Sequence, residues 1–133
     1  MLSIFPQLLD LQFFGPLFLR LILGAIFIVH GYPKLFKNFA GTVQFFESIG
    51  IRPAKFWVVA VGLTEFVGGI FLIAGFLVQL VALAAIVDMA VAIWKVGRKR
   101  GFVGGYEFEL SLLVIALSLL VLGPGAYAID FPL

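Results

Sequence analysis

Three apolar stretches of the chain each carry one ionisable residue, and these residues, His30, Glu65 and Asp88, are the first candidates for chemistry. A charge near the middle of a membrane helix costs roughly 2.5–3.5 kcal/mol on the mildest scales, so such residues usually face a partner or a water-filled cavity. Imidazole and carboxyl groups exchange protons, and in a dry pocket they can shuttle them. We therefore expect any chemistry of this chain to lie among these residues.

Each of the three also has a structural interpretation, which the sequence leaves open. In that interpretation Glu65 pairs with His30 or with a lysine and holds the helices together. His30 is then a hydrogen-bonded packing residue, and Asp88 pairs with Lys95 or with His30.

The composition is that of a membrane protein. Of the 133 residues 63% are hydrophobic and 12% are charged, whereas soluble domains have about 45–50% apolar and about 25% charged residues. The chain has no cysteine and one histidine. This excludes disulfide exchange, iron–sulfur ligation and bis-histidine haem ligation by this chain alone, and we predict no metal site. The basic residues lie at membrane edges, so no nucleic-acid partner is predicted.

Four apolar segments have about the 20 residues that a spanning helix needs. They cover residues 16–36, 56–77, 78–96 and 107–123. We expect a single all-α domain over residues 1–133, an integral membrane four-helix bundle. Between the first two segments, Val43, Phe46 and Ile49 recur at helical spacing and predict a short amphipathic helix at the membrane surface.

The positions of lysine and arginine predict how the protein is oriented in the membrane. The loops 37–55 and 97–106, with the helix ends beside them, hold every basic residue except Arg20. Because basic loops stay in the cytoplasm, we expect a multi-pass protein of the cell membrane with both loops cytoplasmic and both termini outside.

A shared polar layer is expected in the half of the bilayer next to these loops. His30, Glu65 and Asp88 each lie about 10–13 Å from the loop end of their segment, at about 1.5 Å per residue. Glu107 and Glu109 stand at the same end of the fourth segment. A bundle that turned these residues inward would hold them at one depth.

An ordered set of short motifs resembles the DoxX family, and the resemblance covers nearly the whole chain. The motifs are Arg20-Leu-Ile-Leu-Gly24, His30-Gly31-Tyr32-Pro33-Lys34-Leu35-Phe36, Gly62-Leu-Thr-Glu65-Phe-Val-Gly68-Gly69, Gly104-Gly105-Tyr106-Glu107, and Leu122-Gly123-Pro124-Gly125 followed by Asp130. The resemblance implies a small four-helix membrane protein. Family members are commonly named quinol-oxidase subunits or oxidoreductases, and related proteins include a subunit of a thiosulfate:quinone oxidoreductase.

The family pattern also implies site residues. It implies catalytic roles for His30, Glu65 and Glu107, and ligand-binding roles for Arg20, Lys34 and Tyr106. Asp88 is not part of the pattern and joins the ligand-binding candidates through its depth alone. Besides His30, Glu65 and Asp88, three of these residues have structural alternatives. Arg20 is expected to snorkel to the outer interface and Lys34 to the interface at its helix end, and Glu107 would favour a helix N-terminus through the dipole.

Three functions compete at this point. The first is a membrane oxidoreductase component whose cavity binds a quinone, the cofactor that the family names imply. The second is a non-catalytic membrane partner or assembly factor that docks another protein. The third is a small lipid- or solute-binding module, which with four helices per chain would need a homo-oligomer for transport.

Overall fold

The computed structural model describes residues 3–130, and its secondary structure there consists of helices without strands. A 3₁₀ helix, Pro6–Phe14, leads into the first of five α-helices. These are α1 (Gly15–Tyr32), α2 (Phe39–Ser48), α3 (Ala54–Ala74), α4 (Val78–Lys95) and α5 (Glu107–Leu122). A π-helical turn, Pro33–Lys37, extends α1, and the short helices Gly97–Arg100 and Phe102–Tyr106 connect α4 to α5.

Four stretches within the described residues are long and apolar enough to cross a membrane. They are Pro6–Lys37, Ala54–Ala74, Val78–Lys95 and Phe102–Leu122. The predicted all-α membrane fold with a short helix between the first two spans is therefore confirmed.

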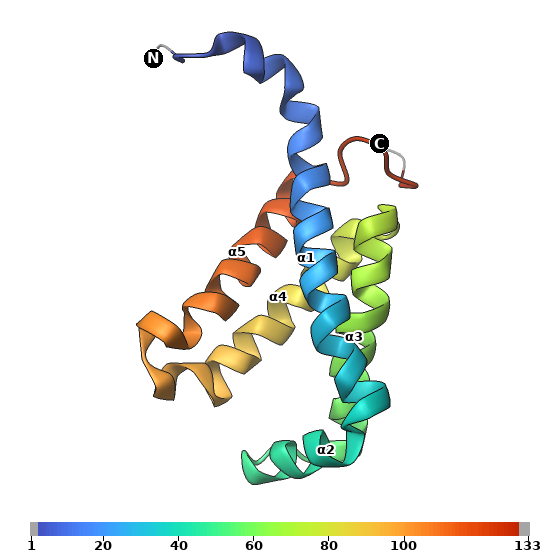
Figure 1. Cartoon of the computed structure of the whole chain (residues 1–133), viewed down its shortest axis with the longest axis vertical. Helices are drawn as coiled ribbons and strands as arrows, with labels where there is room; N and C mark the ends of the chain where they lie inside the picture. Colours follow the sequence, from blue (N-terminus) through green and yellow to red (C-terminus); the bar gives the residue numbers. More distant parts are fainter. Residues whose placement is uncertain (1–2, 131–133) are drawn as a thin grey trace.

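Helices α1 and α3 lie side by side, and so do α4 and α5 (Figure 1). Glycines allow the first pair to approach closely. A Cβ atom built on Gly24 would lie 2.7 Å from the carbonyl oxygen of Gly69, and one on Gly69 would lie 2.7 Å from that of Gly24. In a bilayer, where lipid is as apolar as leucine, such backbone proximity is a principal source of helix association.

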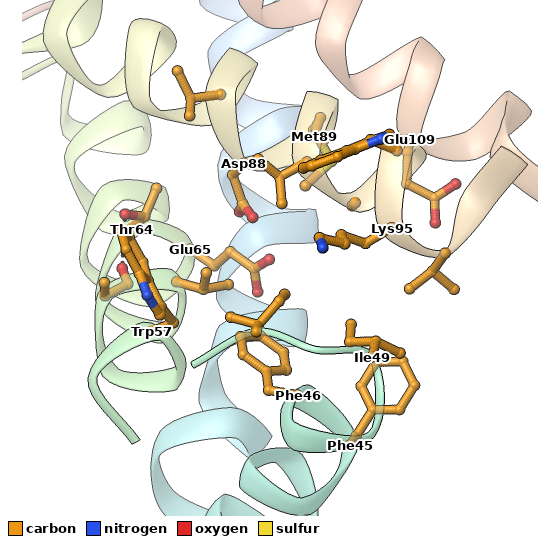
Figure 2. Close-up of a pocket in the computed structure, with 18 of the residues that line it drawn as sticks. Phe45, Phe46, Ile49, Trp57, Thr64, Glu65, Asp88, Met89, Lys95 and Glu109 are labelled. Carbon is orange, nitrogen blue, oxygen red and sulfur yellow. Dashed lines mark hydrogen bonds between the residues drawn. The ribbon is translucent and has the colours of Figure 1, made fainter. Parts of the chain in front are cut away.

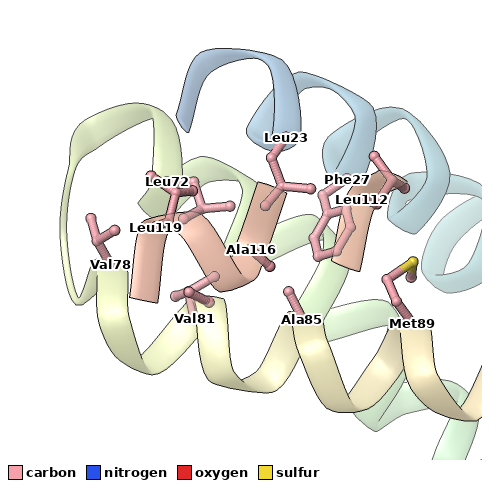
Figure 3. Packing of buried hydrophobic residues seen from close by; sticks show 11 residues of the cluster. Leu23, Phe27, Leu72, Val78, Val81, Ala85, Met89, Leu112, Ala116 and Leu119 are labelled. Atoms are coloured by element: carbon pink, nitrogen blue, oxygen red, sulfur yellow. The ribbon is translucent and has the colours of Figure 1, made fainter. Parts of the chain in front are cut away.

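A hydrophobic core joins the two pairs (Figure 3). Leu23 and Phe27 of α1 meet Leu72 of α3, Ala85 of α4 and Ala116 of α5 in one cluster. Many other large apolar side chains stay exposed on the outer surface, as expected where the solvent is lipid. The core therefore holds four spanning helices around one centre.

The connection between α3 and α4 is a tight turn, as predicted. Gly75 ends α3 in the left-handed region (φ +74°), which glycine adopts without steric cost. Helix α4 begins where the amide nitrogens of Leu77 and Val78 each donate to the carboxylate of Asp130, at 2.8 Å. The C-terminal segment thus caps a helix far from it in sequence.

Helix α2 crosses the end of the bundle opposite the two chain ends (Figure 1). It is amphipathic as predicted, since Val43 and Phe46 are buried while Gln44 and Glu47 are exposed. Its apolar side packs against the start of α3, around Val58. The predicted surface helix therefore forms the floor of the bundle at that end.

Candidate functional site

A cavity of about 840 Å³ opens between α2, α3 and α4, at the end of the bundle that carries the loops. Figure 2 shows Phe46 of α2 and Ile49, the residue after α2, on one side of it, with Glu65 of α3 and Asp88 of α4 facing it from others. Ligand pockets usually measure 300–1,000 Å³ and are walled by apolar and aromatic side chains with a few polar groups. The size and lining of this cavity fit that description.

Glu65 lies about 16 Å along α3, near its middle, at about 1.5 Å per residue. Its side chain is buried, and its Oε2 accepts a hydrogen bond from Nζ of Lys34 at 2.5 Å. Lys34 stands in the π-helical turn that follows α1, and π-helical turns often mark functional sites. A charged pair thus forms at the inner wall of the cavity.

Glycine also brings these two residues together. A Cβ atom built on Gly31 would lie 2.5 Å from the amide nitrogen of Phe66 and 2.9 Å from Cβ of Glu65. Only a residue without a side chain therefore allows α1 to approach α3 at this level. The approach places Lys34, one turn further along, within reach of Glu65.

Asp88 adds a second carboxyl group, on the side of α4 that faces Glu65 (Figure 2). Its Oδ2 is buried and has no hydrogen-bond partner among residues 3–130. Buried polar atoms are nearly always paired, and leaving one unpaired costs about 1–3 kcal/mol. Asp88 is itself one of the residues that line the cavity, so the unpaired oxygen belongs to the cavity wall.

The mouth of the cavity carries a second set of charges. Nη2 of Arg100 donates to Oε1 of Glu109 at 2.6 Å, while Oε2 of Glu109 is buried without a partner among the described residues. Nζ of Lys95 lies 4.5 Å from the ring centroid of Trp94. Lys95, Arg100 and Glu109 therefore add two basic groups and one acidic group to the lining of the cavity.

Lys34, Glu65 and Asp88 together can hydrogen-bond both a donor and an acceptor group of a ligand. The ammonium of Lys34 has three donors, one of which Glu65 uses, so it can also donate to a carbonyl oxygen of a ligand. The free oxygen of Asp88 can accept from a hydroxyl. Within residues 3–130 no group of three or more His, Cys, Asp or Glu side chains that could hold a metal ion lies together.

His30 does not line this cavity. Its side chain is exposed, and its ring packs against Phe108 with the centroids 5.7 Å apart. The expectation that the bundle turns His30 inward to face Glu65 is therefore wrong. Of the two partners proposed for Glu65, a histidine and a lysine, the structure shows the lysine, Lys34.

Glu107 and Tyr106 lie outside the cavity lining as well. Oε1 of Glu107 accepts from the amide of Gly104 at 2.9 Å, which fits the structural alternative of stabilising a helix N-terminus. The ring of Tyr106 packs against Phe102, with centroids 5.3 Å apart. The structure thus places Lys34, Glu65 and Asp88 in the cavity and these two residues beside the α4–α5 connection.

Arg20 neither snorkels to the interface nor approaches the cavity. It is fully buried at the other end of the bundle. Its guanidinium donates to five backbone carbonyls, those of Leu72, Ile73, Pro124, Ala126 and Tyr127, at 2.6–3.3 Å. The snorkelling prediction is wrong because the end of α3 and the C-terminal segment supply enough acceptors to replace water.

Sequence reasoning missed several residues of the cavity. Trp57, Thr64, Lys95, Arg100 and Glu109 all line it. Glu109 was visible at the mouth of the fourth segment, but Glu107, two residues earlier, matched the family motif. Residues two apart on a helix point in different directions, and the register of α5 decides which one faces the cavity.

Comparison with known proteins finds three relatives whose sequences match most of the chain. The chain is 36% identical over 116 residues to "Putative oxidoreductase CatD" of Bacillus subtilis, covering 87% of this chain and 84% of that protein. It is 32% identical over 120 residues to "Inner membrane protein YqjF" of Escherichia coli, covering 87% and 89%. It is 30% identical over 142 residues to "Uncharacterized membrane protein Rv3486" of Mycobacterium tuberculosis, covering 94% and 85%.

No solved structure is significantly similar to the chain. The profile of the DoxX family matches residues 15–98, which run from the start of α1 to just beyond α4. This multi-pass membrane protein therefore belongs to the DoxX family.

Proposed function

We propose that the protein binds a quinone head group in the cavity and acts as the quinone-binding component of a membrane oxidoreductase. The observation that carries the proposal is the unpaired carboxyl oxygen of Asp88, a residue in the wall of a largely apolar cavity that the Lys34–Glu65 pair also lines. A quinone presents carbonyl oxygens that accept from Lys34. Its reduced form presents hydroxyls that donate to Asp88, so both redox forms find a partner.

The cavity also suits a flat ring. Trp57 and Phe46 contribute aromatic surface to its walls, and aromatic side chains stack well on planar groups. The CatD name supports a redox association for a relative of this chain. In this proposal Glu65 and Asp88 exchange protons with the bound head group, and a partner protein carries the electrons because this chain has no cysteine and one histidine.

Tryptophan fluorescence tests the proposal directly, because both tryptophans of the chain, Trp57 and Trp94, line the cavity. Purified protein in nanodiscs is titrated with quinones with and without a tail, and saturable quenching is the expected result. Asp88→Leu should weaken binding of the reduced form by about tenfold, as expected for the loss of one hydrogen bond.

Asp10→Leu is the matched control, since Asp10 is exposed on the N-terminal 3₁₀ helix, outside the cavity lining. It should bind as the native protein does. Quenching that never saturates, or that is equal in the native and Asp88→Leu proteins, would count against the cavity as a quinone site.

The non-catalytic partner remains the second candidate, and the Lys34–Glu65 pair is the observation that favours it. A buried pair of this kind can serve the fold alone, because removing one partner leaves an uncompensated charge and costs about 3–5 kcal/mol. Under that function, variants at the pair lower stability, no quinone binds, and a stoichiometric protein partner copurifies.

A further inference from the structure

A second hollow lies beside the cavity, along the outer surface of the bundle. This second hollow has a volume of about 190 Å³ and lies between α3 and α4. Thr64 of α3 and Ala84 of α4 line both spaces. The two spaces are therefore adjacent and meet at these two residues, and we call the smaller one the tail groove.

The tail groove is apolar along its whole length. Beyond the junction it is lined by Gly68, Phe71, Leu77, Leu80 and Val81. The hydroxyl of Thr64, its one polar side chain, donates to the carbonyl of Ala60 at 2.8 Å and is satisfied within α3. Nothing in the groove could recognise a polar ligand.

The groove opens to the bilayer at membrane depth. Leu80 and Leu77 on its rim are 61% and 41% exposed, and both helices are spanning segments. From Thr64 to Phe71 it follows α3 for about 10 Å, at about 1.5 Å per residue. It therefore runs from the polar head site towards the α3–α4 turn, within the hydrocarbon layer.

We propose that the tail groove holds the hydrocarbon tail of the ligand whose head occupies the cavity, and that the ligand reaches the site sideways from the bilayer, between α3 and α4. This inference rests on the proposed function and adds the class of ligand, an amphiphile with a planar polar head and a long apolar tail. The cavity, which has charges of both signs, would take the polar head of such a ligand. The neighbouring groove, which is wholly apolar, would take its tail.

The groove orients the tail more than it adds affinity. A tail that leaves lipid for the groove exchanges one apolar surface for another, so the hydrophobic gain is small. Blocking the junction, in contrast, should lower the affinity clearly, because it forces the tail to bend or the helices to separate. Steric overlap in a packed interior is costly.

The experiment fills the junction and compares two probes. Ala84→Leu adds bulk from α4, and Thr64→Leu adds it independently from α3, so one folded variant suffices. Each is titrated in nanodiscs, by tryptophan quenching, with a tail-less quinone (menadione) and its isoprenoid homologue (menaquinone). We expect about a tenfold loss of affinity for the long-tailed probe, at the lower end of what overpacking costs. Thr64 and Ala84 also line the head cavity, so the affinity for menadione is expected to fall too, but by a much smaller factor than the affinity for menaquinone. An equal loss for both probes would overturn the tail groove.

Ala90→Leu is the matched control, because Ala90 is exposed on α4 and lines neither space. It should leave both affinities unchanged. If the junction variants bind menaquinone as the native protein does, the tail lies elsewhere and the groove holds only ordinary lipid. That result overturns this inference while the proposed function stands, whereas native protein that binds neither probe overturns both.

Discussion

Arg20 shows how a single buried charge can organise a membrane protein. Its five carbonyl acceptors come from the end of α3 and from the segment after α5. The carbonyls at the end of a helix lack partners within that helix, and lipid offers none. One guanidinium therefore satisfies several orphaned acceptors and ties the C-terminal segment to the bundle.

We predict that Arg20→Leu destabilises the protein strongly, by about 3 kcal/mol or more, since hydrogen bonds to a charged group are each worth about 1.5–3 kcal/mol. Arg20→Lys should recover part of the loss, because an ammonium has fewer donors than a guanidinium. Thermal unfolding in detergent measures both. Arg98→Gln, at an exposed arginine, is the control, and equal melting temperatures for all variants would contradict a structural role for Arg20.

The sequence could predict how deep the ionisable residues lie in the membrane, but not the direction in which their side chains point. His30 and Lys34 are one helical turn apart, so either could approach α3. In the structure Gly31 is the residue on the contact line, and His30 lies beside it on the exposed surface. The long stem of Lys34 reaches Glu65 from one turn away. The choice depended on helix rotation, which hydrophobic periodicity does not determine in an all-apolar segment.

At the scale of elements, the contact between α1 and α3 is the one that builds the inner wall of the site. Gly24 and Gly31 lie along it, facing Gly69 and Glu65. Small residues at these positions were readable as helix-packing signals from the sequence. Their consequence for the site was not, because it depends on which residue each glycine faces.

We predict that Gly31→Ala separates α1 from α3 and weakens the site. The new Cβ would lie 2.5 Å from a backbone nitrogen of α3, and such overpacking costs about 1–3 kcal/mol. The melting temperature and the quinone affinity should fall together, because Lys34 moves with α1. Gly15→Ala is the control, as a Cβ there meets nothing within 4 Å. A Gly31→Ala protein with native affinity would show that this contact does not position the site.

Helix α2 illustrates where sequence reasoning reached its limit for an element. Its amphipathic pattern predicted the helix and its buried face correctly. An apolar face can be covered either by lipid or by the rest of the protein, and the pattern is the same in both cases. Here Phe46 packs with the start of α3 and also lines the cavity, so the helix belongs to the site.

For the whole molecule, the two ends of the bundle differ in chemistry. One end has Arg20, the backbone carbonyls that it hydrogen-bonds and both chain ends. The other end has α2, the α4–α5 connection and the cavity. The basic residues other than Arg20 belong to the second end. Four spans and this asymmetry were predictable from composition and hydropathy alone, since they require no knowledge of helix rotation.

We predict that the cavity end faces the cytoplasm. The chain has no cysteine, so a single introduced cysteine reports its side of the membrane without background. Tyr127 and Lys99 are both exposed. Tyr127 lies in the C-terminal segment that Arg20 holds, whereas Lys99 lies in the connection between α4 and α5. A membrane-impermeant maleimide should label Tyr127→Cys in intact cells, and should label Lys99→Cys only after the membrane is permeabilised. The reverse pattern would place the mouth of the cavity outside, so that its carboxyl groups would exchange protons with the external medium instead of the cytoplasm.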